Sequence, residues 1–212
     1  MLSILQAAGW PIWPLLICSI VALALIIERF MSLRPARVAP ARLLDEVMTV
    51  TRGGLPPADT INKLAENSTL GMVLAEGLRA AAADNRITEA NLRSAFETAG
   101  RQAVHELERN LNSLGTIASA APLLGLLGTV VGMIEIFGAS GASTGTAGGN
   151  PLELAHGISV ALYNTAFGLI VAIPSLAFYR HFRARVDAYA LGLEQAAERM
   201  LPHVLRLLNG RR

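Results

Sequence analysis

The chain has 212 residues, of which 52% are hydrophobic and 16% are charged. A soluble domain carries about 25% charged residues, so this composition indicates a membrane protein. The net charge of +2 comes with scattered basic residues, which serve better as topology determinants than as a nucleic-acid-binding surface, and the single cysteine, Cys18, excludes an intrachain disulfide.

Three stretches carry no charged side chain, at residues 1–27, 110–134 and 154–179. Each can contain the roughly 20 apolar residues that cross a bilayer as a helix. We therefore predict an all-α integral membrane protein with three transmembrane helices. The first stretch differs from a cleaved signal peptide, because it lacks a basic start and is followed directly by Glu28 and Arg29.

The basic residues predict the orientation of these helices. All 18 Lys and Arg residues lie at 29–109 or 180–212. Loops rich in Lys and Arg stay in the cytoplasm, so the N-terminus is predicted outside and the C-terminus inside. The predicted parts are a periplasmic N-terminus at 1–9, a first span at 10–33, a cytoplasmic helical region at 34–112, a second span at 113–137, a periplasmic loop at 138–153, a third span at 154–179 and a cytoplasmic C-terminal helix at 180–212.

The cytoplasmic region is expected to be helical. Short helices are predicted at 41–51, 59–66 and 70–83, with Asp59 as the N-cap of the second. Thr88 is predicted to cap a long helix, which should continue without a break into the second span. One apolar stripe follows that helix at Leu92, Phe96, Ala99, Ala103, Leu107 and Leu111. The region looks too elongated for a compact domain, so its stripes should pack on each other or on neighbouring subunits.

The second and third spans are rich in small residues, whereas residues 15–27 of the first span suit direct lipid contact. Small residues allow helix backbones to approach closely, and Gly128 and Gly132 form a GxxxG pair. The two prolines are expected to kink their helices, and the Gly- and Ser-rich residues 138–149 to form a flexible outer loop. The predicted helix-packing residues are Pro122, Gly125, Gly128, Gly132, Gly168 and Pro174.

Four polar residues within the spans are candidates for an ion path. Thr129 and Thr165 lie near the middle of their spans, Asn164 lies beside Thr165, and Glu135 lies near the outer end of the second span. Hydroxyls in such helices commonly bond to their own backbone, and Asn164 could make an interhelical hydrogen bond. Glu135 fits either a functional carboxylate or one that reaches the headgroups. No catalytic constellation, metal cluster or cofactor motif stands out, so an ion gradient is the expected energy source.

Two motifs resemble one family. Residues 115–137, GTIASAAPLLGLLGTVVGMIEIF, and residues 157–174, GISVALYNTAFGLIVAIP, are similar in order and spacing to the MotA/TolQ/ExbB proton-channel family. The IERF at 27–30 and the three-span layout look more like the ExbB branch than the TolQ branch, and less like the four-span stators.

The resemblance implies a homopentamer in the bacterial inner membrane that surrounds the single transmembrane helix of an ExbD-like partner. The partner would supply the protonatable aspartate, and Thr129 and Thr165 would face the pore. Proton flow would energise a TonB-like protein for outer-membrane import of iron chelates. A TolQ-like role in envelope integrity and division, or a passive scaffold without an ion path, are the alternatives.

The chain departs from the family pattern at Val160, where many relatives have a glutamate. Val160 lies five residues outward of Thr165, and Glu135 lies six residues outward of Thr129, roughly 9 Å along a helix. We therefore hypothesise that Glu135 replaces the missing acid as an outer proton relay. The acid could also be dispensable, as it is in stator relatives with an apolar residue there.

Overall fold

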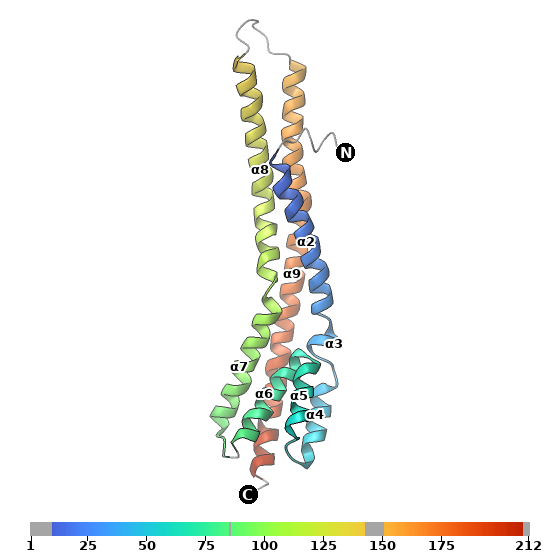
Figure 1. Ribbon diagram of the computed structural model, residues 1–212, viewed down its shortest axis with the longest axis vertical. Coiled ribbons are helices and arrows are strands. Elements are labelled where there is room, and N and C mark those ends of the chain that lie inside the picture. Colours follow the sequence, from blue (N-terminus) through green and yellow to red (C-terminus); the bar gives the residue numbers. More distant parts are fainter. Residues whose placement is uncertain (1–9, 85, 143–150, 210–212) are drawn as a thin grey trace. The chain divides into compact units, whose positions relative to one another are not determined.

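The computed structural model describes residues 10–84, 86–142 and 151–209, except for the side chains at 139–142, 151–154, 156 and 160. Every element in these residues is a helix (Figure 1). The chain forms two compact units: Met1–Glu28 with Asn110–His181, and Arg29–Arg109 with Phe182–Arg212. The helices are α2 (Ile12–Ser32), α3 (Pro35–Val38), α4 (Leu43–Val50), the 3-10 helix η1 (Thr51–Gly53), α5 (Ala58–Asn67), α6 (Thr69–Ala83), α7 (Glu89–Glu108), α8 (Leu111–Ala142) and α9 (Pro151–Asn209).

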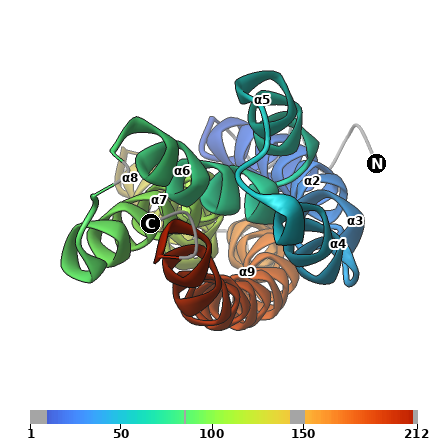
Figure 2. The same cartoon turned by 90° about the horizontal axis from the view of Figure 1, so that it is seen from below.

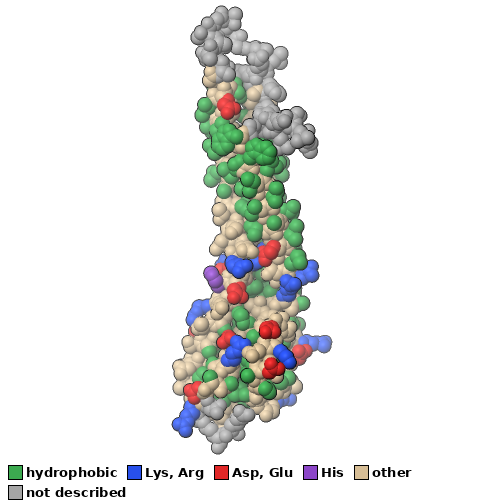
Figure 3. All heavy atoms as spheres, viewed as in Figure 1, with side chains coloured by type: hydrophobic (Ala, Val, Ile, Leu, Met, Phe, Trp, Pro, Cys, Tyr) green, Lys and Arg blue, Asp and Glu red, His purple; other side chains and the backbone are tan. Residues whose placement is uncertain are grey.

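Hydrophobic and charged side chains are distributed differently over the two units. Hydrophobic side chains gather on the unit built from α2, α8 and the first part of α9, which we call the apolar unit (Figure 3). Charged side chains gather on the other, which we call the charged unit. Three helical segments, within Ile12–Ser32, Glu89–Gly138 and Gly157–Asn209, are long and apolar enough to cross a membrane. The predicted helical fold with three helices of membrane-spanning length is confirmed for the described residues.

The first span is less exposed than the sequence suggested. Leu15 and Ala22 are buried, and Leu15 packs with Ala121 and Val171 of the other two long helices. Other side chains of α2 are exposed, among them Ile17, Ile20 at 69% and Leu23. Only part of α2 is therefore available for direct lipid contact.

The predicted continuous helix is interrupted between the two units. The helix α7 ends at Glu108 and α8 begins at Leu111, with a turn between them. At the turn, the Arg109 amide donates to the carbonyl of Glu106, three residues back, instead of four. The Asn110 side chain donates to Glu28 at 3.1 Å. No Gly or Pro marks this break, so the pattern of apolar residues could not reveal it.

The two helices that adjoin the predicted outer loop are both longer than expected. The helix α8 runs to Ala142, beyond the expected end of the second span at 137. The helix α9 starts at Pro151, a residue well suited to the first turn of a helix because its missing amide hydrogen is not needed there. The expected flexible loop lies partly within α8, and its residues 143–150 lie outside the described residues.

The charged unit has its own hydrophobic core, which corrects the expectation of an elongated region without a compact fold. Helix α6 lies beside both α5 and α7, and the end of α9 completes the core (Figures 1 and 2). The predicted stripe of α7 is buried, from Leu92 at 0% exposure to Leu107 at 5%. Phe96 fills the space above Gly77, where an added Cβ would lie 2.1 Å from the ring. The stripe therefore packs within the chain.

The helix boundaries of the charged unit follow local hydrogen bonding. Thr88 caps α7 as predicted, and Ser68 caps α6 by accepting from the Gly71 amide at 3.0 Å. The prediction for Asp59 was wrong: Pro57 occupies the N-cap position of α5, and Asp59 forms an ion pair with Lys63 one turn later. Gly54 has φ of 126°, a conformation that side chains disfavour, and it ends η1.

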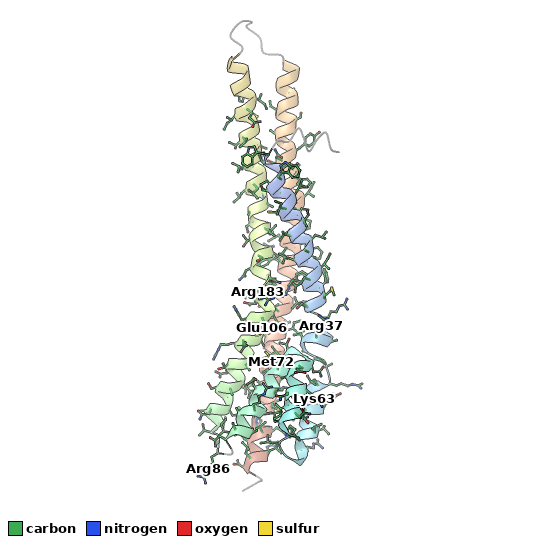
Figure 4. All side chains as sticks on the ribbon, viewed as in Figure 1. Arg37, Lys63, Met72, Arg86, Glu106 and Arg183 are labelled. Carbon is green, nitrogen blue, oxygen red and sulfur yellow. The ribbon has the colours of Figure 1, made fainter. Side chains whose placement is uncertain are left out.

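One arginine of the charged unit is buried at the C-terminal end of α7. Arg29 is 4% exposed, and its guanidinium donates to the carbonyl of Leu107 at 2.9 Å. The last carbonyls of a helix have no partner within the helix, so this bond satisfies one of them. Near the same end of α7, Arg183, which is labelled in Figure 4, pairs with Glu108 at 2.8 Å. These contacts join the start of the charged unit to α7 and α9.

A histidine of α9, His203, is expected to make the stability of this unit depend on pH. The buried hydroxyl of Thr51 donates to the carbonyl of Val47 at 2.7 Å and therefore accepts from Nε2 of His203 at 2.8 Å. Burial, followed by the charges of Arg206 and Arg52, lowers the pKa of His203 below its ordinary value of 6.5. The unfolded chain therefore binds more protons than the folded chain in the window just below pH 6.5.

We expect the full free energy of unfolding above that window. Part of it, the contribution of neutral His203, should be lost as the pH falls through the window. Thermal unfolding of the detergent-solubilised protein, followed by circular dichroism between about pH 5 and pH 8, would measure this change. A His203→Gln variant keeps a donor toward Thr51 but cannot titrate, so its profile should be flatter. An unchanged slope in the variant would assign the pH dependence to other groups.

Candidate functional site

The second and third long helices approach most closely where their glycines meet. A Cβ added to Gly125 would lie 2.8 Å from the carbonyl oxygen of Asn164 and 3.0 Å from the Cα of Thr165. A Cβ added to Gly168 would lie 2.6 Å from the carbonyl oxygen of Ala121. Backbone atoms cannot move aside as a flexible side chain can. These two positions therefore admit only glycine at the observed helix separation.

The predicted GxxxG pair lies on the same face of α8. Gly128 faces the side chain of Asn164, and Gly132 faces Ala161, where an added Cβ would be 3.2 Å from the Ala161 Cβ. This pair packs against α9 of its own chain. The predicted packing role of these four glycines thus has a direct geometric basis. We call the region where Gly125, Gly128, Gly132 and Gly168 lie between α8 and α9 the glycine contact.

The hydroxyl groups of the spans divide into two kinds. The hydroxyls of Thr116, Ser119, Thr129, Ser159 and Ser175 each donate to a carbonyl of their own helix, three or four residues back. Thr165 differs, because its hydroxyl donates across the glycine contact to the carbonyl of Gly125 at 3.3 Å. The alternative that the hydroxyl bonds only to the backbone of its own helix therefore holds for Thr129, whose hydroxyl lies 2.6 Å from the Leu126 carbonyl. It does not hold for Thr165.

These hydrogen bonds determine what each hydroxyl can offer a passing group. A threonine hydroxyl has one hydrogen and two lone pairs. In both threonines the hydroxyl hydrogen is donated to a carbonyl, so the free lone pairs can accept a hydrogen bond from another donor. The Thr165 bond is long for an O–H···O contact, whereas the Thr129 bond is short. Thr165 can therefore turn its hydrogen toward a carboxylate at lower cost than Thr129.

Asn164 lies within the glycine contact. It is 2% exposed, and its side chain lies against Gly128. Its buried amide and the Thr165 hydroxyl bring polarity to an interface that otherwise consists mainly of glycine and alanine. The structure thus brings Asn164 and Thr165 together at one level of α9, facing Gly128 and Gly125.

Glu135 and Thr129 lie on different sides of α8. Glu135 is exposed, and six residues of α-helix turn the chain by 600°, so the two side chains diverge by about 120°. The two side chains therefore do not share a face of the helix. Val160, which was predicted to lie at a depth similar to that of Glu135, is in α9, and its side chain is outside the described residues.

The remaining predicted packing residues are both interior to helices. Pro122 lies within α8 and Pro174 within α9, and each helix continues past its proline. Pro174 is exposed and Pro122 half-buried. Neither takes part in the glycine contact, so their expected role as kinks stays a prediction.

Sequence reasoning missed two further close approaches. An added Cβ at Gly157 would lie 2.5 Å from the side chain of Ile136, and one at Gly115 would lie 3.1 Å from the ring of Tyr179. Each is a single glycine opposite one large side chain. In the sequence, both glycines lie at the ends of segments rich in small residues. This pattern does not indicate which side chains they face.

The site is a close, glycine-lined helix pair that holds one interhelical hydroxyl bond and one buried amide. Together with three apolar helices, this defines a multi-span membrane protein whose second and third helices form a tightly packed unit. The family model of the MotA/TolQ/ExbB proton channel family matches residues 65–195, which include the glycine contact.

Curated relatives agree with that match. Over 196 residues the chain is 35% identical to the biopolymer transport protein ExbB-like 3 of Synechocystis sp., covering 91% of this chain and 90% of that protein. It is 31% identical over 173 residues to the biopolymer transport protein exbB1 of Vibrio cholerae, covering 81% and 74%. It is 40% identical over 96 residues to the Tol-Pal system protein TolQ of Haemophilus influenzae, covering 44% and 40%. The chain belongs to the MotA/TolQ/ExbB proton channel family, as an ExbB-like member.

Proposed function

We propose that this chain is the channel-forming subunit of a proton-driven motor in the bacterial inner membrane. Homopentamers would surround the single transmembrane helix of an ExbD-like partner, and the motor would energise a TonB-like protein for outer-membrane import of iron chelates. The observation that carries this proposal is the Thr165–Gly125 bond, which puts a threonine hydroxyl at the glycine contact. The proposed orientation, with the charged unit in the cytoplasm, is supported by the confinement of all 18 basic residues to 29–109 and 180–212.

A carboxylate on the partner helix would be costly to leave charged among glycine and alanine. The lone pairs of Thr129 and Thr165 suit the protonated acid, which donates a hydrogen bond. If Thr165 turned its hydroxyl hydrogen toward the charged carboxylate, it would stabilise that carboxylate only in the sector of the rotation where the partner helix faces Thr165. Protonation would then allow the acid to pass the apolar sectors, and relative rotation of the two subunits would follow.

The first test is growth of a deletion strain under iron limitation, complemented with the wild-type chain. Rescue by the chain together with its own partner genes would support the import role. Normal growth of the deletion strain would contradict it and would favour the TolQ-like alternative, for which the TolQ relative is the specific observation. Envelope leakage and cell chaining would then be the decisive assays.

Proton flux separates the motor from a passive scaffold. The purified complex of chain and partner, reconstituted in vesicles with a pH-sensitive dye inside, should conduct protons under an imposed potential. A scaffold would assemble and give no flux.

Glu135 provides a separate prediction about the outer end of the path. If it replaces the acid absent at position 160, Glu135→Gln should lower proton flux several-fold, because the amide cannot exchange a proton, while Glu135→Asp should retain more. Vesicle flux at equal protein content would measure both. Full flux in Glu135→Gln would assign this exposed carboxylate to the headgroup region.

A further inference from the structure

One face of α9 in the charged unit carries positive charge that the chain does not neutralise. Arg185, Arg199 and Arg206 are exposed, and none of them forms an ion pair within the described residues. They follow one another at intervals of fourteen and seven residues. Seven residues turn an α-helix by about 700°, only about 20° short of two full turns, so the three arginines share one face. We call this face the arginine stripe.

The acidic side chains of this part of α9 lie on another face. Measured from Arg199, helix geometry places them about 100° to 140° around the axis, all in the same direction: Glu198, Asp187 and Glu194. That direction leads toward α7, because Glu198 pairs with Arg93 of α7 at 3.2 Å. Positive and negative side chains of α9 are therefore separated, and the arginine stripe receives no counter-charge from its own helix.

Small side chains lie between the arginines on the same face. Ala184, Ala188 and Gly192 follow one another at intervals of four residues, and all three are exposed. A Cβ added to Gly192 would meet nothing within 4 Å. In Figure 2 the last part of α9 lies at the edge of the charged unit, with α4, α6 and α7 on its other sides. Small residues at this spacing let a second helix approach closely, so the stripe suits a helix as its partner.

Two simpler roles do not account for the arginine stripe. A cation in the last turn of a helix interacts favourably with the helix dipole, and this applies to Arg206. Arg185 and Arg199 lie in the interior of α9, beyond the reach of that effect. Basic residues that determine membrane topology act through their number in a loop, so they need no alignment on one face. The alignment therefore indicates a contact.

The length and composition of the stripe disfavour lipid and single-stranded nucleic acid as the partner. Arg185 and Arg206 are separated by about 31 Å along α9. A headgroup layer is only about 5–8 Å thick, so a helix that crosses the bilayer cannot present all three arginines to lipid. Single-stranded nucleic acid is held by stacking on aromatic side chains, and the described residues of this face include none. An acidic protein helix fits the stripe better than either.

The chain itself offers no matching acidic face. Within the described residues, α5 and α9 each carry one pair of carboxylates seven residues apart. In each pair the first carboxylate is already in an ion pair, Asp59 with Lys63 at 3.2 Å and Asp187 with Arg183 at 3.4 Å. The carboxylates that complement the arginine stripe are therefore expected on a different protein.

We infer that the arginine stripe binds an acidic α-helix of a second protein, in which carboxylates recur at seven-residue intervals. A partner with the same period keeps its charges beside the arginines along the whole stripe. The charges set orientation and register, and Ala188 and Gly192 allow the close approach. The contact goes beyond the proposed function, since it lies on the charged unit and outside the glycine contact.

Peptide binding to the full chain in detergent tests the inference. The probe is a fluorescein-labelled helical peptide of about 25 residues, long enough to follow the stripe, with glutamates every seven residues among alanines and glutamines. Fluorescence anisotropy would measure its affinity. The Arg185→Gln/Arg199→Gln variant should bind the peptide about fivefold more weakly, because two charge pairs are lost. Arg86→Gln, the same change at an exposed arginine on the α6–α7 turn, should bind it as the wild type does.

Gly192→Leu tests the close approach separately from charge. Leucine at this open position meets nothing in the described chain, so the thermal midpoint should not fall. The new side chain would keep a docked helix away from α9, so peptide affinity should fall about fivefold. Wild-type affinity in this variant would contradict helix docking.

The matched control probe is a peptide of the same composition whose glutamates are dispersed around the helix, and it should bind about fivefold more weakly. Equal binding of the two peptides would overturn the inference, because charge alone would then suffice. Displacement of the peptide by lower concentrations of polyuridine RNA or short-chain phosphatidylglycerol would also overturn it, in favour of RNA or lipid. Binding is read without proton flux, so a chain that binds the peptide but conducts no protons would refute the proposed function and keep this contact.

Discussion

Gly125→Ala is expected to lower the stability of the apolar unit more than any other single methyl addition in α8. The new Cβ would lie 2.8 Å from the Asn164 carbonyl oxygen, closer than van der Waals contact permits, and the obstacle is backbone. The helices would have to separate, which should cost about 1–3 kcal/mol through lost packing. Separation would also weaken the Thr165–Gly125 bond. Thermal unfolding in detergent, followed by aggregation-sensitive fluorescence chromatography, would measure the loss.

Gly138→Ala is the matched control, since it makes the same change in the same helix. A Cβ added to Gly138 meets nothing within 4 Å. Alanine is also the better helix former by about 1 kcal/mol, so this variant should be as stable as the wild type or slightly more so. Equal midpoints for Gly125→Ala and Gly138→Ala would show that α8 and α9 do not pack as described.

Thr165→Val is expected to lower proton flux roughly three- to tenfold, the effect of losing one net hydrogen bond at the proposed ion path. Valine matches the shape of threonine and removes only the hydroxyl. The lost bond joins α9 to α8 at 3.3 Å, and its length indicates a small contribution to stability. Assembly and membrane level should therefore stay near wild type while the flux falls. Flux in reconstituted vesicles and growth under iron limitation would measure the functional loss.

Thr116→Val separates this function from packing. Thr116 is exposed on α8, and its hydroxyl bonds only to the carbonyl of Asn112. The control variant loses a hydroxyl in the same helical environment without removing an interhelical bond. Its flux should be unchanged. If Thr165→Val instead failed to assemble, the hydroxyl would be assigned to helix packing and not to proton transfer.

Composition and periodicity determined much of this protein. The three uncharged stretches predicted the long apolar helices, and the apolar repeat of α7 correctly identified its buried face, because burial of a helix face leaves a period of 3.6 in the residues. The glycine-rich motifs in the second and third spans also carried the family resemblance that the family match confirms. These properties are local or compositional, and they need no knowledge of what each helix touches.

The tertiary structure decided which residues contact each other. Thr129 and Thr165 are equivalent in the sequence, yet only Thr165 bonds across to another helix, since that depends on where two helices cross. The core of the charged unit joins α6 to residues of α9 more than a hundred positions later, a pairing that no period encodes. Asp59 is a favourable cap by type, but the backbone places Pro57 at the cap position. Faces follow from periodicity, whereas contacts follow from the packing of helices in three dimensions.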